Sequence, residues 1–213
     1  MRIIAGISAA TIAIVSIAPM TSAQSISLGL RGTGSFPTGS FAQDQSSTNA
    51  ALIEGAKNGF GFGLDAGLAL GMIGVYAGFD RIKFDCETAT CRTDGKYTLQ
   101  GVTVGAKLMP PMMSAFRPFV KGGVTFFNLK GGYGGSSSNR LETDQAPGYE
   151  IGAGGDIAFL GLVSITPQVR FVGQNLKAKV PGVTTTTTTP TQGVNYFSFD
   201  LGLSVHTPFG GMD

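Results

Sequence analysis

The chain is poor in charged residues, has no tryptophan, and carries one histidine and two cysteines in 213 residues. Charged residues make up 13% of it, about half of the ~25% that is typical of soluble domains. Hydrophobic residues nevertheless reach 42%, which excludes a disordered chain. A net charge of +2 provides no general basic patch, so we expect no nucleic-acid partner. The few His and Cys residues predict neither a metal site nor a cofactor.

Long apolar runs are equally scarce, because only the N-terminal segment approaches the length of a membrane helix. This excludes a polytopic helical membrane protein. The segment has a positive start at Arg2, a charge-free run over 3–20, and the small residues Thr21, Ser22 and Ala23. Such a layout is typical of a secretory signal peptide, and a retained anchor helix is the alternative. We predict a signal peptide at 1–23 and one exported domain at 24–213.

The two cysteines, Cys86 and Cys91, lie close together in the polar segment CETATC. An oxidising compartment would join them in a small loop. A metal site would need further Cys or His ligands, and none lie nearby in the sequence. We therefore predict a Cys86–Cys91 disulfide that stiffens one loop.

Glycine is abundant, with 33 residues, and much of it alternates with apolar side chains. The clearest segment is 60–70, where Phe60, Phe62 and Leu64 alternate with glycines and Asp65. A repeat of two residues with one apolar face predicts a β-strand. Seven further segments fit this pattern, near 26–31, 73–80, 102–108, 120–126, 149–159, 163–171 and 197–206.

The alternation changes phase at two places. Ile82 and Phe84 fall on the opposite face from Phe79, and Tyr97 and Leu99 fall on the opposite face from Val102. Either a β-bulge absorbs one residue there, or the strand has left the apolar layer.

Long and short connections alternate between the predicted strands. Long polar or glycine-rich links at 37–57, 85–95, 130–147 and 177–193 alternate with short links at 71–72, 110–115 and 160–162. In an antiparallel meander, this order puts the long loops at one end and the tight turns at the other. Barrels of bacterial outer membranes have this asymmetry. We predict an all-β fold, an eight-stranded antiparallel up-and-down transmembrane β-barrel, in which Pro167 causes a local loss of pairing.

Aromatic residues support a membrane location, because they gather near the two ends of the predicted strands. Such girdles suit the two membrane interfaces. The predicted external girdle contains Phe36, Phe60, Phe62, Phe126, Tyr149, Phe171, Phe197 and Phe199, and the periplasmic girdle contains Phe116, Phe159 and Phe209.

The direction of the apolar face separates a soluble barrel from a membrane barrel. A soluble barrel needs a charge-rich exterior, which a 13% charge content does not supply. With the apolar face turned towards lipid, the inward rows carry charges of both signs. These are the cations Arg31, Lys107, Arg117, Lys121 and Arg170 and the carboxylates Asp65, Asp80, Glu150, Asp156 and Asp200. Balanced charges in so narrow a barrel predict a salt-bridged interior, and a narrow or gated conduction path is the alternative.

The sequence resembles the small outer-membrane β-barrel family, which includes the OmpA-like transmembrane domain, OmpX-like, opacity and porin-family surface proteins. The final strand YFSFDLGLSVHTPF carries the resemblance best, together with GSFPTGSF at the end of the first strand. The resemblance implies a C-terminal signal for the outer-membrane assembly machinery, formed by Phe197, Phe199, Leu201, Leu203, Val205 and Phe209. Four residues follow Phe209, which departs from a family pattern that ends on the aromatic residue.

The remaining polar motifs do not predict a catalytic site. His206 and Ser204 share a face, but a two-residue spacing of about 7 Å along a strand is too long for direct contact. The glycine-rich segment 131–139 lacks the Lys and the helix of a phosphate loop. We expect a non-enzymatic protein of the bacterial outer membrane that contacts membrane lipid and meets an unknown surface ligand through its external loops. A narrow pore for small solutes is the alternative, and a lipid-modifying enzyme is a further one.

Overall fold

The computed structural model describes residues 24–43, 55–86, 95–110, 116–132, 140–179 and 191–209. The predicted signal peptide and the threonine run at 184–189 lie outside these residues. Nine strands and one short 3₁₀ helix occur in the described ranges. They are β1 (Gln24–Thr38), η1 (Gly39–Phe41), β2 (Ala56–Leu70), β3 (Ile73–Cys86), β4 (Lys96–Leu108), β5 (Phe116–Gly132), β6 (Arg140–Thr143), β7 (Ala146–Leu160), β8 (Val163–Lys179) and β9 (Thr191–Phe209). Within the described ranges, no helix has the length and apolar character needed to cross a membrane.

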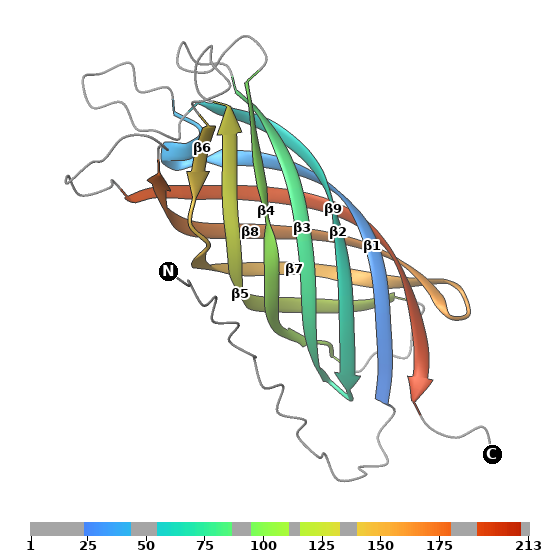
Figure 1. The fold of residues 1–213 in the computed structure, drawn as a ribbon. Coiled ribbons are helices and arrows are strands. Elements are labelled where there is room, and N and C mark those ends of the chain that lie inside the picture. The colour runs from blue at the N-terminus through green and yellow to red at the C-terminus, as the bar shows by residue number, and fades with distance from the viewer. Residues whose placement is uncertain are drawn as a thin grey trace, which may run out of the picture.

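Eight long strands close into an antiparallel barrel (Figure 1). The ring runs from β1 through β2, β3, β4, β5, β7 and β8 to β9, and β9 pairs back with β1 over the whole length of β1. The short strand β6 pairs with the end of β5 and with β8, so it continues the position of β7 around the barrel. The predicted eight-stranded fold is confirmed. The ladders extend further than predicted, because β6 lies within the 130–147 connection.

Tight turns join β2 to β3 and β7 to β8 at one end of the barrel, where the seven residues 109–115 also connect β4 to β5, and the longer connections lie at the other end. Gly71 begins the β2–β3 turn with a φ of 66°, and Gly161 begins the β7–β8 turn with a φ of 55°. Glycine adopts this left-handed conformation at little cost, and a two-residue hairpin requires it. We call these ends the turn end and the loop end.

The two phase changes are not β-bulges. β3 and β4 keep one register from Ile73↔Leu108 to Asp85↔Lys96, and β3 alternates between exposed and buried residues almost to its last residue. Ile82 and Phe84 therefore point inward because the strand has left the apolar layer, which was the second of the two sequence interpretations. The register shifts lie elsewhere, between Ala56 and Gly59 in β2 and between Ala158 and Leu160 in β7.

Pro167 interrupts the pairing on one side of β8. The β7–β8 ladder pairs Gly154 with Gln168 and resumes at Ile157 with Ile165, while Pro167 still aligns with Leu201 of β9. Proline has no N–H to donate, so one ladder must lose a hydrogen bond. The predicted local loss of pairing is confirmed.

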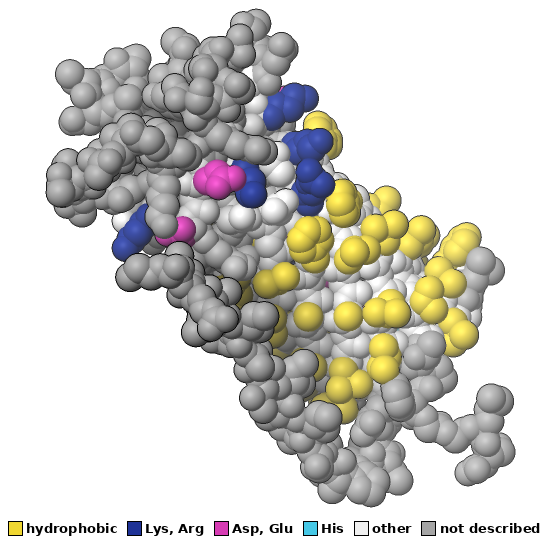
Figure 2. All heavy atoms as spheres, viewed as in Figure 1, with side chains coloured by type: hydrophobic (Ala, Val, Ile, Leu, Met, Phe, Trp, Pro, Cys, Tyr) yellow, Lys and Arg dark blue, Asp and Glu magenta, His cyan; other side chains and the backbone are white. Residues whose placement is uncertain are grey.

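The outer surface carries a band of exposed apolar side chains, one face of which is seen in Figure 2. Leu64 is 50% exposed and Leu201 is 62% exposed, although both lie in the middle of long strands. At the loop end of the band, the rings of Tyr149, Phe171 and Phe197 form a row of contacts, with centroids 6.0 and 4.9 Å apart. An apolar exterior with an aromatic edge is the arrangement that hydrocarbon favours.

The inside of the barrel changes character along its axis. The inward row of β3 shows this, because it passes from Gly74, Tyr76 and Asp80 to Ile82 and Phe84. At the loop end, the interior is a buried apolar cluster in which Phe84 contacts Phe41 of η1 and Tyr196 of β9. The cluster contains Phe41, Ala56, Ile82, Phe84, Tyr97, Leu99, Phe127, Leu129, Val172, Leu176, Val194 and Tyr196. This cluster was not predicted from the sequence, where its signal is the pair of phase changes.

Candidate functional site: the charged layer of the lumen

Seven of the ten predicted inward charges meet in one layer across the lumen. Each comes from a different strand, seven of the eight barrel strands in all, so residues far apart in the sequence form the layer. The layer consists of Arg31, Asp65, Asp80, Lys121, Glu150, Arg170 and Asp200, which we call the charged layer. It holds three cations and four carboxylates, and all of these side chains except Asp65, which is 27% exposed, are nearly inaccessible to solvent.

Arg170 lies at the centre of the charged layer. Its Nε donates to Asp200 Oδ2 at 2.5 Å, and its Nη1 donates to Glu150 Oε2 at 2.8 Å and to Asp80 Oδ2 at 3.2 Å. The guanidinium thus joins carboxylates from three different strands. Its planar fork of five donors suits it to this role, which a lysine with one nitrogen would not fill.

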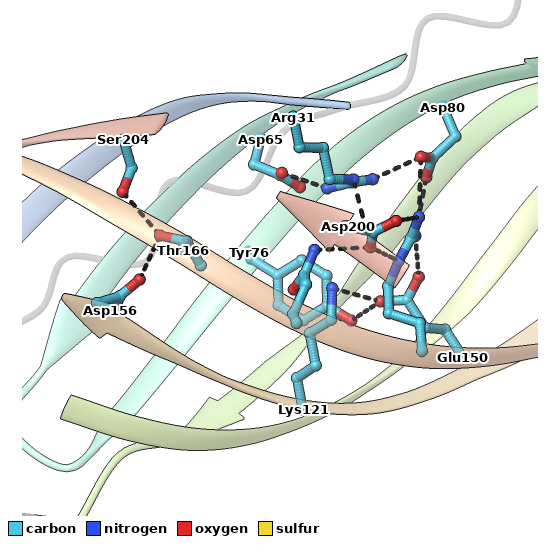
Figure 3. A network of polar contacts seen from close by, with 12 residues as sticks. Arg31, Asp65, Tyr76, Asp80, Lys121, Glu150, Asp156, Thr166, Asp200 and Ser204 are labelled. Atoms are coloured by element: carbon cyan, nitrogen blue, oxygen red, sulfur yellow. Dashed lines mark hydrogen bonds and ion pairs between the residues drawn. The ribbon is translucent and has the colours of Figure 1, made fainter. Parts of the chain in front are cut away.

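Arg31 forms the second centre, between β1, β2 and β3 (Figure 3). It donates to Asp65, and its Nη2 donates to Asp80 Oδ1 at 2.6 Å. Asp80 therefore accepts from both arginines. Gly63 makes room for this arrangement, because a Cβ at Gly63 would lie 2.7 Å from the carbon and two nitrogens of the Arg31 guanidinium.

Lys121 and Tyr76 complete the layer on the opposite side. Lys121 Nζ lies 2.9 Å from Glu150 Oε1, and the Tyr76 hydroxyl donates to the same oxygen at 2.9 Å. Gln168 Nε2 donates to Asp200 Oδ2 at 3.0 Å. Neither Tyr76 nor Gln168 was predicted to have a role, although both lie on inward rows next to predicted charges.

The other three predicted charges lie outside the charged layer, towards the turn end. Lys107 Nζ lies over the rings of Phe119 and Tyr76, at 4.8 and 5.7 Å from their centroids. Asp156 accepts from Thr166 Oγ1 at 2.7 Å, and Arg117 is exposed. A cavity of about 70 Å³ lies among these side chains, and it ends at Arg31 and Lys121 of the charged layer.

Ser204 and His206 are in contact, which corrects the expectation drawn from their spacing. Ser204 Oγ lies 3.1 Å from His206 Nε2, and 3.2 Å from Thr166 Oγ1. The estimate of about 7 Å applied to backbone positions, whereas the imidazole ring reaches back along the strand. Among the described residues, no carboxylate hydrogen-bonds His206, so the pair lacks the orienting third group of a catalytic triad.

The predicted disulfide and the predicted C-terminal assembly signal involve residues or partners that the structure does not describe. Cys86 ends β3 and Cys91 lies outside the described residues, so the disulfide between them stays a prediction. The alternate residues Phe197, Phe199, Leu201, Leu203 and Val205 all face outward from β9. Their recognition by an assembly machinery stays a prediction, and the Phe209 side chain is not described. No group of three metal-ligating side chains occurs in the described ranges.

The family model for the outer membrane protein β-barrel domain matches residues 7–206, most of the chain. The protein belongs to this family. Its barrel therefore lies in the bacterial outer membrane. Because outer-membrane barrels have short periplasmic turns and longer external loops, the turn end is periplasmic and the loop end is external. No curated protein matches the sequence significantly.

Solved structures agree with the family in fold. The crystal structure of OprG from Pseudomonas aeruginosa is similar over 87% of this chain and 96% of its own, with a TM-score of 0.56 and 15% identity. Neisserial surface protein A is similar over 85% and 96%, with a TM-score of 0.54 and 13% identity. The Escherichia coli outer membrane protein W is similar over 88% and 100%, with a TM-score of 0.51 and 15% identity. Identities this low show a shared fold, not a shared function.

Proposed function

We propose that this outer-membrane barrel protein is a closed membrane scaffold that presents its external loops to molecules at the cell surface. One observation carries the proposal: two successive layers of buried side chains fill the lumen. The charged layer closes its middle, and the apolar cluster around Phe84 closes its external end. Proteins of this fold serve several roles, so the filled lumen, not the fold, supports the proposal.

The filled lumen also argues against the alternative of a narrow pore. A solute entering from the periplasm would reach the 70 Å³ cavity and then meet Arg31 and Lys121. To go further, it would have to separate buried ion pairs and then cross an apolar layer. Breaking one buried ion pair costs about 3–5 kcal/mol, because each charge then stays buried without a partner. A state with an open lumen would therefore be rare.

Conductance separates the two functions. Purified protein in planar bilayers is expected to show no reproducible single-channel steps. Arg170→Ala is expected to show no steps either, because the apolar cluster around Phe84 still closes the external end of the lumen. Regular openings of the unchanged protein, lost on substitution of Arg170 or Lys121, would instead establish the pore.

Surface binding tests the role of the loops. Intact cells that express the protein are applied to an array of immobilised matrix proteins, serum proteins and glycans. Shortening the chain within 133–139 or 181–189, which lie between the described strands, is expected to abolish binding to at least one surface. The heat-induced gel shift of folded barrels serves as the folding control. Binding that survives every loop deletion, or an array that captures no cells, contradicts the proposal.

A further inference from the structure

Basic side chains gather on the outer surface next to the external edge of the apolar band (Figure 2). On β3, the outward row runs through Ile73, Val75 and Phe79 and then changes to Arg81 and Lys83. Both cations are exposed, and both lie on the part of β3 that extends beyond the apolar band. The outward row therefore changes from apolar to charged between two consecutive outward residues, Phe79 and Arg81.

The register places these two cations beside aromatic rings on one side. Arg81 is aligned with Phe62 of β2, and Lys83 is aligned with Phe60, which is 74% exposed. On the other side, Gln100 and Thr98 of β4 align with the same two cations. Asp85 is the next outward residue of β3 after Lys83, but it is aligned with Lys96 of β4 and pairs with that cation.

Other exposed cations at the same level already have carboxylate partners. Lys96 Nζ lies 3.6 Å from Asp85, and Lys130 Nζ lies 3.4 Å from Glu142. Within the described ranges, Arg81 and Lys83 have no carboxylate within 4.0 Å. They are thus a pair of adjacent exposed cations without an ion-pair partner among the described residues, next to the external edge of the apolar band.

The position of Arg81 and Lys83 relative to the membrane indicates which anion could pair with them. Arg and Lys beside an apolar band extend their aliphatic stems along it and hold the charged head at the level of the headgroups. Phosphate is the anion found at that level, and adjacent Arg and Lys suit it because the guanidinium binds two oxygens and the ammonium adds a point charge. We propose that Arg81 and Lys83 form a binding site for the phosphate headgroup of an outer-leaflet lipid. The aromatic pair Phe60 and Phe62 packs against its acyl chains.

This site concerns the membrane and not the loops, so it goes beyond the proposed function and does not depend on it. The test uses the folded mature barrel in phosphatidylcholine vesicles that contain a trace of spin-labelled lipid. Electron paramagnetic resonance measures the fraction of label immobilised at the protein surface, for spin-labelled phosphatidic acid and for spin-labelled phosphatidylcholine. Phosphatidic acid presents the phosphate, and phosphatidylcholine masks it with a cationic group.

The unchanged protein is expected to prefer phosphatidic acid by on the order of fivefold or more at low salt, since each cation near the headgroups contributes at about that level. Arg81→Gln/Lys83→Gln should reduce the preference to about one. Arg81→Lys/Lys83→Arg should retain it, which separates charge from packing. Lys177→Gln is the matched control, because Lys177 is also exposed but lies on β8, three strands from β2.

Three results would overturn the proposal. The unchanged protein could bind both lipids equally, the double Gln variant could keep the preference, or Lys177→Gln could reduce it as much as the double Gln variant does. The last result would assign the effect to overall charge and not to a site. All the substituted side chains are exposed, and the heat-induced gel shift verifies that each variant is folded.

Discussion

Replacing Arg170 by methionine removes the central cation of the charged layer while keeping much of its volume. Arg170 is 1% exposed and donates to Asp80, Glu150 and Asp200. After the substitution, two cations remain for four carboxylates. Removing one partner of a buried ion pair costs about 3–5 kcal/mol, because the other charge stays buried without compensation. We expect a loss of that size in the free energy of unfolding.

Urea unfolding of the barrel in lipid vesicles measures this loss. Far-ultraviolet circular dichroism follows the transition, since the chain has no tryptophan. Arg117→Met is the matched control. Arg117 is exposed, so its replacement should change the free energy by less than about 0.5 kcal/mol.

A double-mutant cycle sharpens the test. Asp200→Asn in the Arg170→Met background removes a charge that has lost its main partner, so it should recover part of the stability. The expected coupling energy is about 1–3 kcal/mol. A loss below about 1 kcal/mol for Arg170→Met, or strict additivity with Asp200→Asn, would refute the view that the charged layer stabilises the folded barrel.

Two further substitutions test the packing of the lumen by the same unfolding assay. Gly63→Ala should cost about 1–3 kcal/mol, because its Cβ would displace the Arg31 guanidinium, whereas Gly32→Ala meets no atom within 4 Å and should be neutral; equal effects would contradict the packing. Phe84→Ala should cost about 3–5 kcal/mol, because it leaves a cavity between two aromatic rings. Phe60→Ala, on the lipid-facing surface, should cost clearly less, and a larger loss there would show that the apolar cluster is not a core.

The sequence predicted which face each strand turns to lipid, because alternation with a period of two defines the two faces without any knowledge of tertiary structure. Leu64 and Asp65 illustrate this, since neighbours in sequence must lie on opposite sides of the barrel wall. The number of strands followed from the eight alternating segments, and the two unlike ends of the barrel followed from the alternation of long and short connections. Both predictions depend only on local patterns.

The pairing of inward charges depends on register, which local patterns do not define. Lys107 and Lys121 are aligned on neighbouring strands, yet only Lys121 reaches Glu150, and Lys107 lies over aromatic rings instead. The contact between Ser204 and His206 depends on how a ring is turned along the strand. Neither the contact of Lys121 with Glu150 nor that of Ser204 with His206 can be predicted from the spacing of residues in the sequence.

The apolar cluster shows how the membrane boundary reverses the pattern. Within the apolar band, hydrophobic side chains face outward and polar ones face inward. Beyond it, the outside is polar, so Arg81 and Lys83 face outward, while Ile82 and Phe84 form a core as they would in a soluble barrel. The phase change marks this boundary. It was visible in the sequence, but two interpretations fitted it equally well.

The surroundings of outward leucines test the whole account most directly. Spin labels placed at Leu64, Leu201 and Lys177 of the vesicle-bound protein can be relaxed by oxygen, which concentrates in hydrocarbon, or by a nickel chelate, which stays in water. The account predicts that oxygen dominates at Leu64 and Leu201 and that the chelate dominates at Lys177. Relaxation of the two leucine labels by the chelate, as strong as that at Lys177, would contradict a barrel whose apolar side chains face lipid.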